Sequence, residues 1–125
     1  MLMDTCEIKV SGSAFGVDDF LKSSNLKPVE IWRRGEMLSS ETVPFLDSGF
    51  LLVISDGVDK PLDFHVKEAT RFLAVQEPEL LRAVRSGAED LRLIIGLNRN
   101  DPSPEYLPPK LLLLAGRLDI GIDLT

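Results

Sequence analysis

The side chains best suited to chemistry in this sequence are one histidine, one cysteine and a tryptophan followed by two arginines. The chain carries a single His, His65, and a single Cys, Cys6, so a zinc site built from several such ligands is excluded within it. A Ser-His-Asp or Cys-His catalytic set would have to use His65 itself. A lone histidine on a helix more often makes a hydrogen bond at the helix surface or at the edge of a core. We therefore predict no catalytic residue, no metal site and no cofactor.

The second candidate is the run Trp32-Arg33-Arg34, which precedes Gly35 and Glu36. An aromatic plane beside two guanidinium groups can bind carboxylates, phosphates or the acidic patch of a partner. The alternative is that the tryptophan packs in a groove while both arginines pair with neighbouring acids, and this is favoured because surface ion pairs are common. We expect Trp32 to anchor the core, since a lone exposed tryptophan is the rarer case.

A third possibility is a small-molecule pocket between the sheet and the loop 98–109. Such pockets are mostly apolar with a few convergent polar groups, which Arg33, Arg34, His65 and Tyr106 could supply. The glycines lack the spacing of a phosphate-binding loop, so nucleotide hydrolysis is not expected.

The elements that would position these residues follow from hydrophobic periodicity. Alternation of apolar and polar residues predicts strands over 6–12, 29–34 and 119–124. Continuous apolar runs predict buried strands over 50–54, at the centre of the sheet, and over 91–97. Helical spacing predicts a short helix from Val17 and a long one from Leu62, with a break near Glu77 where Pro78 starts a second helix that ends at Gly87. A last, leucine-rich helix is predicted over 110–115, ending at Gly116.

This order of elements predicts an α+β fold. The first six elements match a ferredoxin-like βαββαβ unit, an antiparallel sheet with helices mainly on one face, to which a helix and a strand are added. A chain of 125 residues is long enough for one hydrophobic core, so we expect a single domain over residues 1–125.

The charge balance bears on partners. Twenty acidic residues stand against fourteen basic ones, a formal net charge of −6, which disfavours nucleic acid as a partner and favours a basic protein. No apolar run approaches the ~20 residues of a membrane span, and the first residues do not have the pattern of a secretory signal, so we expect a cytoplasmic protein without membrane contact. A monomer or a weak homodimer through an exposed sheet edge is expected.

The order and spacing of several short motifs resemble the bacterial domain-of-unknown-function family numbered 4279. The likeness spans nearly the whole chain and is carried by Val10-Ser11-Gly12, Val17-Asp18-Asp19-Phe20, Leu26-Lys27-Pro28, Arg33-Arg34-Gly35-Glu36, the strand from Phe50 to Ser55, the helix from Leu62 and residues 107–122. Phe50 departs from the tryptophan expected there. The resemblance implies a bacterial α+β domain and brings no catalytic residues.

Two functions follow as hypotheses. The first is a small intracellular binding protein without enzyme activity, of the immunity type that neutralises a basic toxin. The alternative is a small-molecule binding or catalytic domain that uses the pocket beside loop 98–109.

Overall fold

The computed structural model describes residues 5–37, 43–57, 60–97 and 105–125. These residues form five strands and three helices, in the order β1 (Thr5–Gly12), α1 (Val17–Lys22), β2 (Glu30–Trp32), β3 (Ser48–Asp56), α2 (Leu62–Arg85), β4 (Asp90–Ile95), α3 (Pro109–Arg117) and β5 (Ile120–Leu124). The predicted α+β class is confirmed, and each predicted strand has a counterpart. Most of the predicted loop 98–109 lies outside the described residues.

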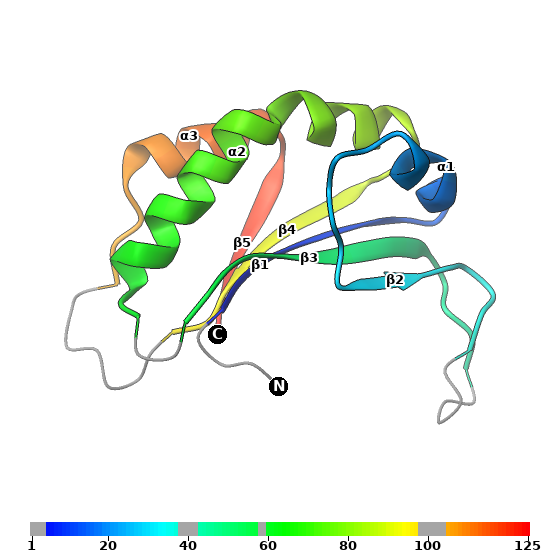
Figure 1. Ribbon diagram of the computed structural model, residues 1–125, viewed down its shortest axis with the longest axis horizontal. Helices are drawn as coiled ribbons and strands as arrows, with labels where there is room; N and C mark the ends of the chain where they lie inside the picture. The colour runs from blue at the N-terminus through cyan, green and yellow to red at the C-terminus, as the bar shows by residue number, and fades with distance from the viewer. Residues whose placement is uncertain (1–4, 38–42, 58–59, 98–104) are drawn as a thin grey trace.

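The strands form one open sheet in the order β2-β3-β1-β4-β5 (Figure 1). Neighbouring pairs from β2 to β4 are antiparallel, whereas β4 and β5 are parallel. The sheet is therefore mixed: the pairs among β1 to β4, the strands of the expected antiparallel unit, are antiparallel, and the added strand β5 runs parallel to β4 because α3 carries the chain back. The central strand is β1 rather than β3, because β1 is the third of the five strands and β3 is the second.

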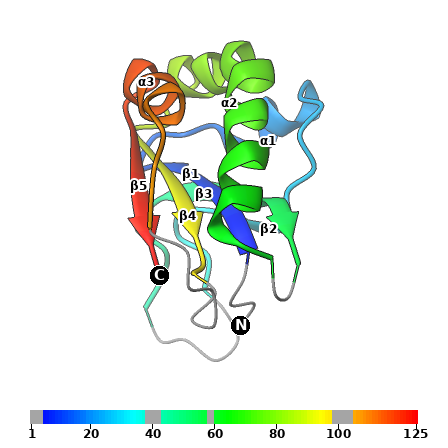
Figure 2. The same ribbon diagram turned by 90° about the vertical axis from the view of Figure 1, so that its left-hand side faces the viewer.

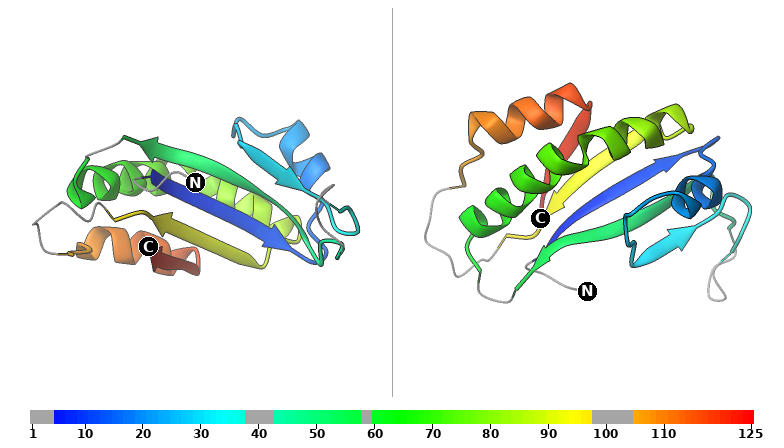
Figure 3. Two further views of the ribbon diagram at one scale, coloured as in Figure 1. Left: turned by 90° about the horizontal axis from the view of Figure 1, so that it is seen from below. Right: turned by 45° about the horizontal axis from the view of Figure 1, so that its top comes forward.

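All three helices cover the same face of the sheet (Figure 1). Figure 2 shows α3 beside α2 on the β5 side. Viewed from the opposite side, the strands lie in front of the helices, and the described residues place no helix over this second face (Figure 3, left). We call it the helix-free face. Within the described ranges, none of the helices combines the length and apolarity needed to cross a membrane.

The hydrophobic core lies between the helices and the sheet. Alternate residues of β1 point into it and pair in register with buried residues of β4: Cys6 with Ile95, Ile8 with Leu93 and Val10 with Leu91. Beneath α1, three phenylalanine rings lie with centroids about 6 Å apart, in contacts that join Phe15, Phe20 and Phe50. The residues between the buried positions of β1 therefore face the helix-free side.

The long helix α2 is continuous through Pro78, so the predicted break near Glu77 is wrong. A proline in a helix interior removes one backbone hydrogen bond and costs about 3 kcal/mol. The carbonyl of Ala74 loses its usual donor at Pro78. Both residues lie on the exposed side of the helix, where water can donate a hydrogen bond to this carbonyl instead. Leu73 and Leu80, on either side of the proline, are fully buried against the core and hold both halves on the sheet.

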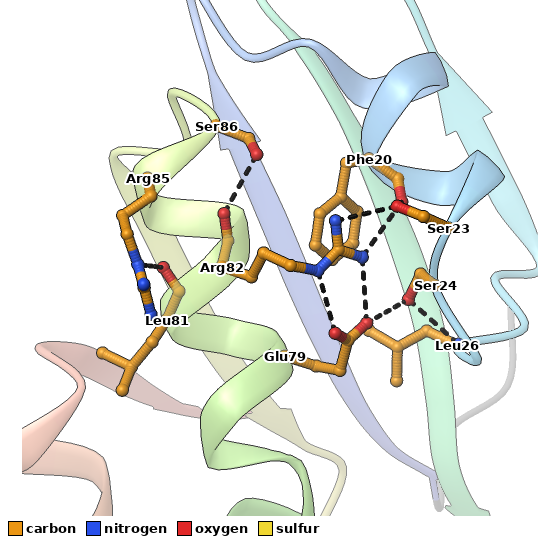
Figure 4. A network of polar contacts seen from close by, with 9 residues as sticks. All are labelled: Phe20, Ser23, Ser24, Leu26, Glu79, Leu81, Arg82, Arg85 and Ser86. Carbon is orange, nitrogen blue, oxygen red and sulfur yellow. Dashed lines mark hydrogen bonds and ion pairs between the residues drawn. The ribbon is translucent and has the colours of Figure 1, made fainter.

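Arg82 ties the short helix α1 to α2 (Figure 4). Its guanidinium lies 4.3 Å from the centroid of the Phe20 ring and donates to the Phe20 carbonyl at 3.2 Å. It also donates to Ser23 Oγ at 3.0 Å and, from Nε, to Glu79 Oε1 at 2.9 Å. The hydrogen bonding of Arg82 to Glu79, followed by a hydrogen bond from Ser24, lowers the pKa of the Glu79 carboxyl. We call this network the Arg82 clamp.

The two later helices end differently with respect to glycine. Gly87 follows the end of α2, as predicted, with φ of +107°, and a Cβ at this position would lie 2.5 Å from the Ala14 carbonyl oxygen. Gly116 was expected to end the last helix, but α3 continues through it to Arg117. Leu118 and Asp119 then donate to carbonyls in the last turn of α3, so the helix end is satisfied without glycine.

Candidate binding surface

The helix-free face carries an open groove of about 420 Å³, which we call the sheet-face groove. It spans four strands and the segment before β3, and its lining residues are Glu7, Lys9, Glu30, Trp32, Phe45, Asp47, Leu51 and Ile94. The strand register brings them together, because Lys9 pairs with Leu51, which pairs in turn with Glu30 on β2. Side chains of paired residues share a face of the sheet.

Trp32 lies in this groove rather than in the core. Its side chain is half-buried and on the opposite side of the sheet from the helices, so the expectation that it anchors the core is wrong. The indole Nε1 donates to Asp47 Oδ1 at 2.9 Å, and the ring centroid is 6.4 Å from that of Phe45. Lys9 Nζ lies 5.6 Å from the indole centroid, in cation–π geometry. These groups hold the indole in place, and the side chain is still partly accessible because it is only half-buried.

Gly49 makes room for this tryptophan. The two residues are paired across β2 and β3, and a Cβ on Gly49 would lie 2.6 Å from the indole Cζ2 and 2.5 Å from the Val10 carbonyl oxygen. A side chain at this position would therefore displace the ring or push β3 away from β1. The glycine lets the indole lie directly on the backbone of the sheet.

A hairpin-like segment after β2 positions Phe45 and Asp47. Gly35 N donates to Phe45 O at 3.0 Å, and Phe45 N donates to Glu36 O at 2.9 Å. Arg33 fixes this segment to the start of α1, because its Nε and Nη2 each lie 2.8 Å from an Asp18 carboxylate oxygen. The bonds to Arg33 lower the pKa of the Asp18 carboxyl. The side of the groove formed by Phe45 and Asp47 is thus held in place by contacts between residues that are far apart in sequence.

The sheet-face groove is acidic. Its charged lining residues are three carboxylates, from Glu7, Glu30 and Asp47, against the single ammonium of Lys9. Lys9 already lies over the indole, and Asp47 already accepts its N–H. Glu7 and Glu30 are then the lining carboxylates that can meet a cation, with the indole and Leu51 as the apolar part of the same lining.

A second hollow, of about 780 Å³, lies beside β2 and is called here the edge hollow. It shares Glu30, Trp32 and Phe45 with the sheet-face groove, and its other lining residues are Val29, Ile31, Glu36 and Met37. Val29 and Ile31 are 61% and 42% exposed, which is high for apolar residues at the margin of a sheet. The two cavities form one continuous surface around Trp32.

The predicted site residues other than Trp32 lie elsewhere. Arg33 is held by Asp18 and Glu36, and Arg34 donates to the Ser13 carbonyl at 3.3 Å. Tyr106 is 64% exposed, shortly before α3. None of these three residues, nor His65, lines either cavity described above. Residues 98–104 of the loop that would close the predicted small-molecule pocket lie outside the described residues.

His65 is fully buried on the helix side of the sheet. It lies in the first turns of α2, and its Nδ1 is 2.8 Å from Ser55 Oγ of β3. This contact joins α2 to the sheet beside Cys6, whose register partner is Ser55. Burial, with a smaller effect of the Glu7 charge, raises the pKa of the Cys6 thiol to about 12. Over the described ranges, no three His, Cys, Asp or Glu side chains lie close enough to hold a metal ion.

Sequence reasoning missed most of the groove. Glu7 and Lys9 were identifiable as the polar face of the first strand, because they alternate with buried Ile8. Phe45 and Asp47 gave no such signal, since they lie in an irregular segment between two strands. Their role depends on backbone hydrogen bonds that bring this segment back to residues 35 and 36.

Comparison with known proteins gives no relative: no family model, no curated protein and no solved structure matches the chain. The functional assignment therefore depends on the residues of the two cavities.

Proposed function

We propose that this chain is a binding protein without enzyme activity, and that its sheet-face groove takes a basic protein partner. The observation that carries the proposal is the half-buried indole of Trp32 in a groove whose lining also includes the carboxylates of Glu7 and Glu30. Aromatic residues are frequent anchors at protein interfaces, and an aromatic plane with flanking carboxylates suits lysine or arginine side chains.

The surroundings of the groove support the same partner chemistry. The chain carries a net charge of −6, which attracts a basic protein over distance and raises its association rate. The exposed apolar residues Val29 and Ile31 adjoin the groove and would be covered by a partner larger than a small ion. Neutralisation of a basic toxin, as by an immunity protein, is the biological role that we assign to such binding by analogy.

The proposal extends to the type of fold, the family, the cellular location and the oligomeric state. We assign residues 5–95 to a ferredoxin-like βαββαβ unit, with α3 and β5 added; the antiparallel pairing of β1 to β4 and the helices on one face support it. Membership of the bacterial domain-of-unknown-function family numbered 4279, a location in the cytoplasm and a monomeric or weakly dimeric state are proposed with it.

The fluorescence of Trp32 provides a direct test, because it is the only tryptophan in the chain. A capped tetralysine peptide should change its emission at low salt and lose this effect at high salt, whereas a tetraglutamate peptide should have no effect. An equal response to both peptides would contradict an acidic groove.

Capture of the natural partner is the second test, with two charge-matched variants. A basic protein should be recovered from a cell extract with the parent chain and with Glu105→Lys, which changes an exposed residue near α3. Glu7→Lys, inside the groove, should lose it. Recovery that is unchanged by Glu7→Lys, or recovery of an acidic partner, would refute the proposal.

A further inference from the structure

We infer that the partner docks on this protein as an extended strand, added to the free edge of β2 with basic and apolar side chains in alternation. The inference rests on the proposed function for the basic character of the partner, and it specifies the mode of binding and the sequence pattern that is recognised.

The position of β2 in the sheet is the first support. It is the terminal strand of the order β2-β3-β1-β4-β5, and within the described part of the chain it pairs only with β3. The outer edge of such a strand presents backbone N–H and C=O groups that can pair with another chain. The edge hollow runs along this strand and continues past it to Met37, so the space beside the backbone is open.

The two edges of the sheet differ in a way that favours β2. At the opposite edge, Asp123 of β5 is paired with Arg92, 3.5 Å away, so this carboxylate already has a basic partner within the sheet. At β2, the apolar side chains of Val29 and Ile31 are exposed, as is Met37 beyond the strand. An added strand would cover them, which stabilises the complex by the hydrophobic effect.

The side-chain pattern of β2 sets the pattern of the strand that it recognises. Glu30 and Trp32 lie on the helix-free face, whereas Ile31 lies on the other face because successive side chains alternate. In an added strand, every second residue would lie beside Glu30 and Trp32 and should be lysine or arginine. The residues between them would lie beside Ile31 and should be apolar.

Charge complementarity selects a basic partner over a second copy of this chain. Among the described residues, the charged side chains that line the edge hollow are Glu30 and Glu36, and Glu36 also lies 3.6 Å from Arg33. Pairing of two copies through β2 would bring two chains of net charge −6 together at these carboxylates, whereas a basic strand would neutralise them.

The test uses two synthetic peptides with capped ends and the intact protein. The first peptide alternates lysine and valine over seven residues, and the second has the same sequence with D-valine. Both have the same charge and composition, but alternation of L and D residues prevents a regular pleated strand. The all-L peptide should bind about tenfold more tightly, because only it can form the backbone hydrogen bonds. Its binding should also slow amide hydrogen exchange within residues 29–32.

Variants separate the edge from the groove. Glu36 lines only the edge hollow and Glu7 only the sheet-face groove. Glu36→Lys should weaken the binding of the all-L peptide more than Glu7→Lys does, and Glu105→Lys should leave this binding unchanged.

Equal binding of both peptides without protection of residues 29–32 would overturn the strand inference and leave the proposed function standing. No response to either peptide would overturn both. If the protein self-associates, if the all-L peptide does not disrupt this association, and if the amides of residues 29–32 are protected from exchange in it, the edge of β2 binds a second copy of the chain instead.

Discussion

Replacement of Arg82 by methionine tests whether the Arg82 clamp holds α1 on the rest of the protein. Methionine keeps an apolar stem of similar length but removes the guanidinium that lies over the Phe20 ring and donates to the Phe20 carbonyl. The short helix α1 buries only Val17 and Phe20 among its own residues, so a large share of its attachment depends on these contacts.

The magnitude can be worked from the contacts. A hydrogen bond from a charged donor contributes about 1.5 kcal/mol at the low end of its range, which applies here because the arginine side chain is 34% exposed. A cation–π contact at such a site adds about 0.5–1 kcal/mol. The pair with Glu79, three residues earlier on the same helix, adds about 0.3 kcal/mol. We expect Arg82→Met to lower the free energy of unfolding by about 2.5 kcal/mol.

Arg85→Met is the matched control. Arg85 lies in the last turn of the same helix, but its Nε donates only to the Leu81 carbonyl of that helix, at 3.4 Å (Figure 4). Both variants remove a positive charge near the helix C-terminus, so this electrostatic effect cancels in the comparison. Arg85→Met should cost less than about 1 kcal/mol.

Urea unfolding monitored by circular dichroism measures both free energies, and amide hydrogen exchange in α1 locates the change. Exchange within residues 17–22 should be faster in Arg82→Met and unchanged in Arg85→Met. If the two variants unfold within about 0.5 kcal/mol of each other, the clamp contributes no significant stability and our reasoning is refuted.

Further predictions concern single positions. Cys6 should resist an aromatic disulfide reagent at mildly alkaline pH in the native protein and react in urea, because burial raises the pKa of its thiol to about 12; rapid labelling of the native state would contradict this. Gly49→Ala should lower the free energy of unfolding by about 2 kcal/mol and shift Trp32 emission, because the new Cβ would overlap the indole; urea titration and fluorescence check both effects. Pro78→Ala should raise the free energy of unfolding by about 1–3 kcal/mol, since α2 gains the missing hydrogen bond, and an unchanged value would show that the proline is strain-free. The pKa of Glu79 is lowered on folding, so its stabilisation relative to Glu79→Gln is complete above about pH 5 and is lost as the pH falls through the folded pKa; a difference in melting temperature that persists at low pH would argue against this.

Much of the secondary structure was predictable because its causes are local. Alternation places Ile8 and Val10 on one face and Glu7 and Lys9 on the other whatever the rest of the chain does. The helical spacing from Leu62 and the glycine at 87 likewise act within a few residues of their own positions. The counts of histidine and cysteine excluded a multi-ligand zinc site within the chain without any structure.

The continuity of α2 was decided by tertiary packing. A proline disfavours a helix interior by about 3 kcal/mol in isolation, and the sequence around Pro78 therefore predicted two helices. Burial of Leu73 and Leu80 against the sheet outweighs that local cost. The same holds for the sheet centre, because the run 50–54 is apolar enough for the central strand, but pairing partners far away in the chain placed β1 there.

The location of Trp32 likewise could not be predicted from the residues next to it in sequence. Local alternation shows that Ile31 and Trp32 point to opposite faces, yet it does not say which face the helices will cover. That choice followed from the docking of α1 and α2 on the side of Phe50, and it left the tryptophan on the helix-free face with Phe45 and Asp47. The sequence by itself determined the order of the strands and helical segments and the polar faces of the strands, because those depend on contacts between near neighbours. Only the tertiary structure decided which polar face became a groove, because that depends on long-range pairing between β1, β2, β3 and the segment before β3.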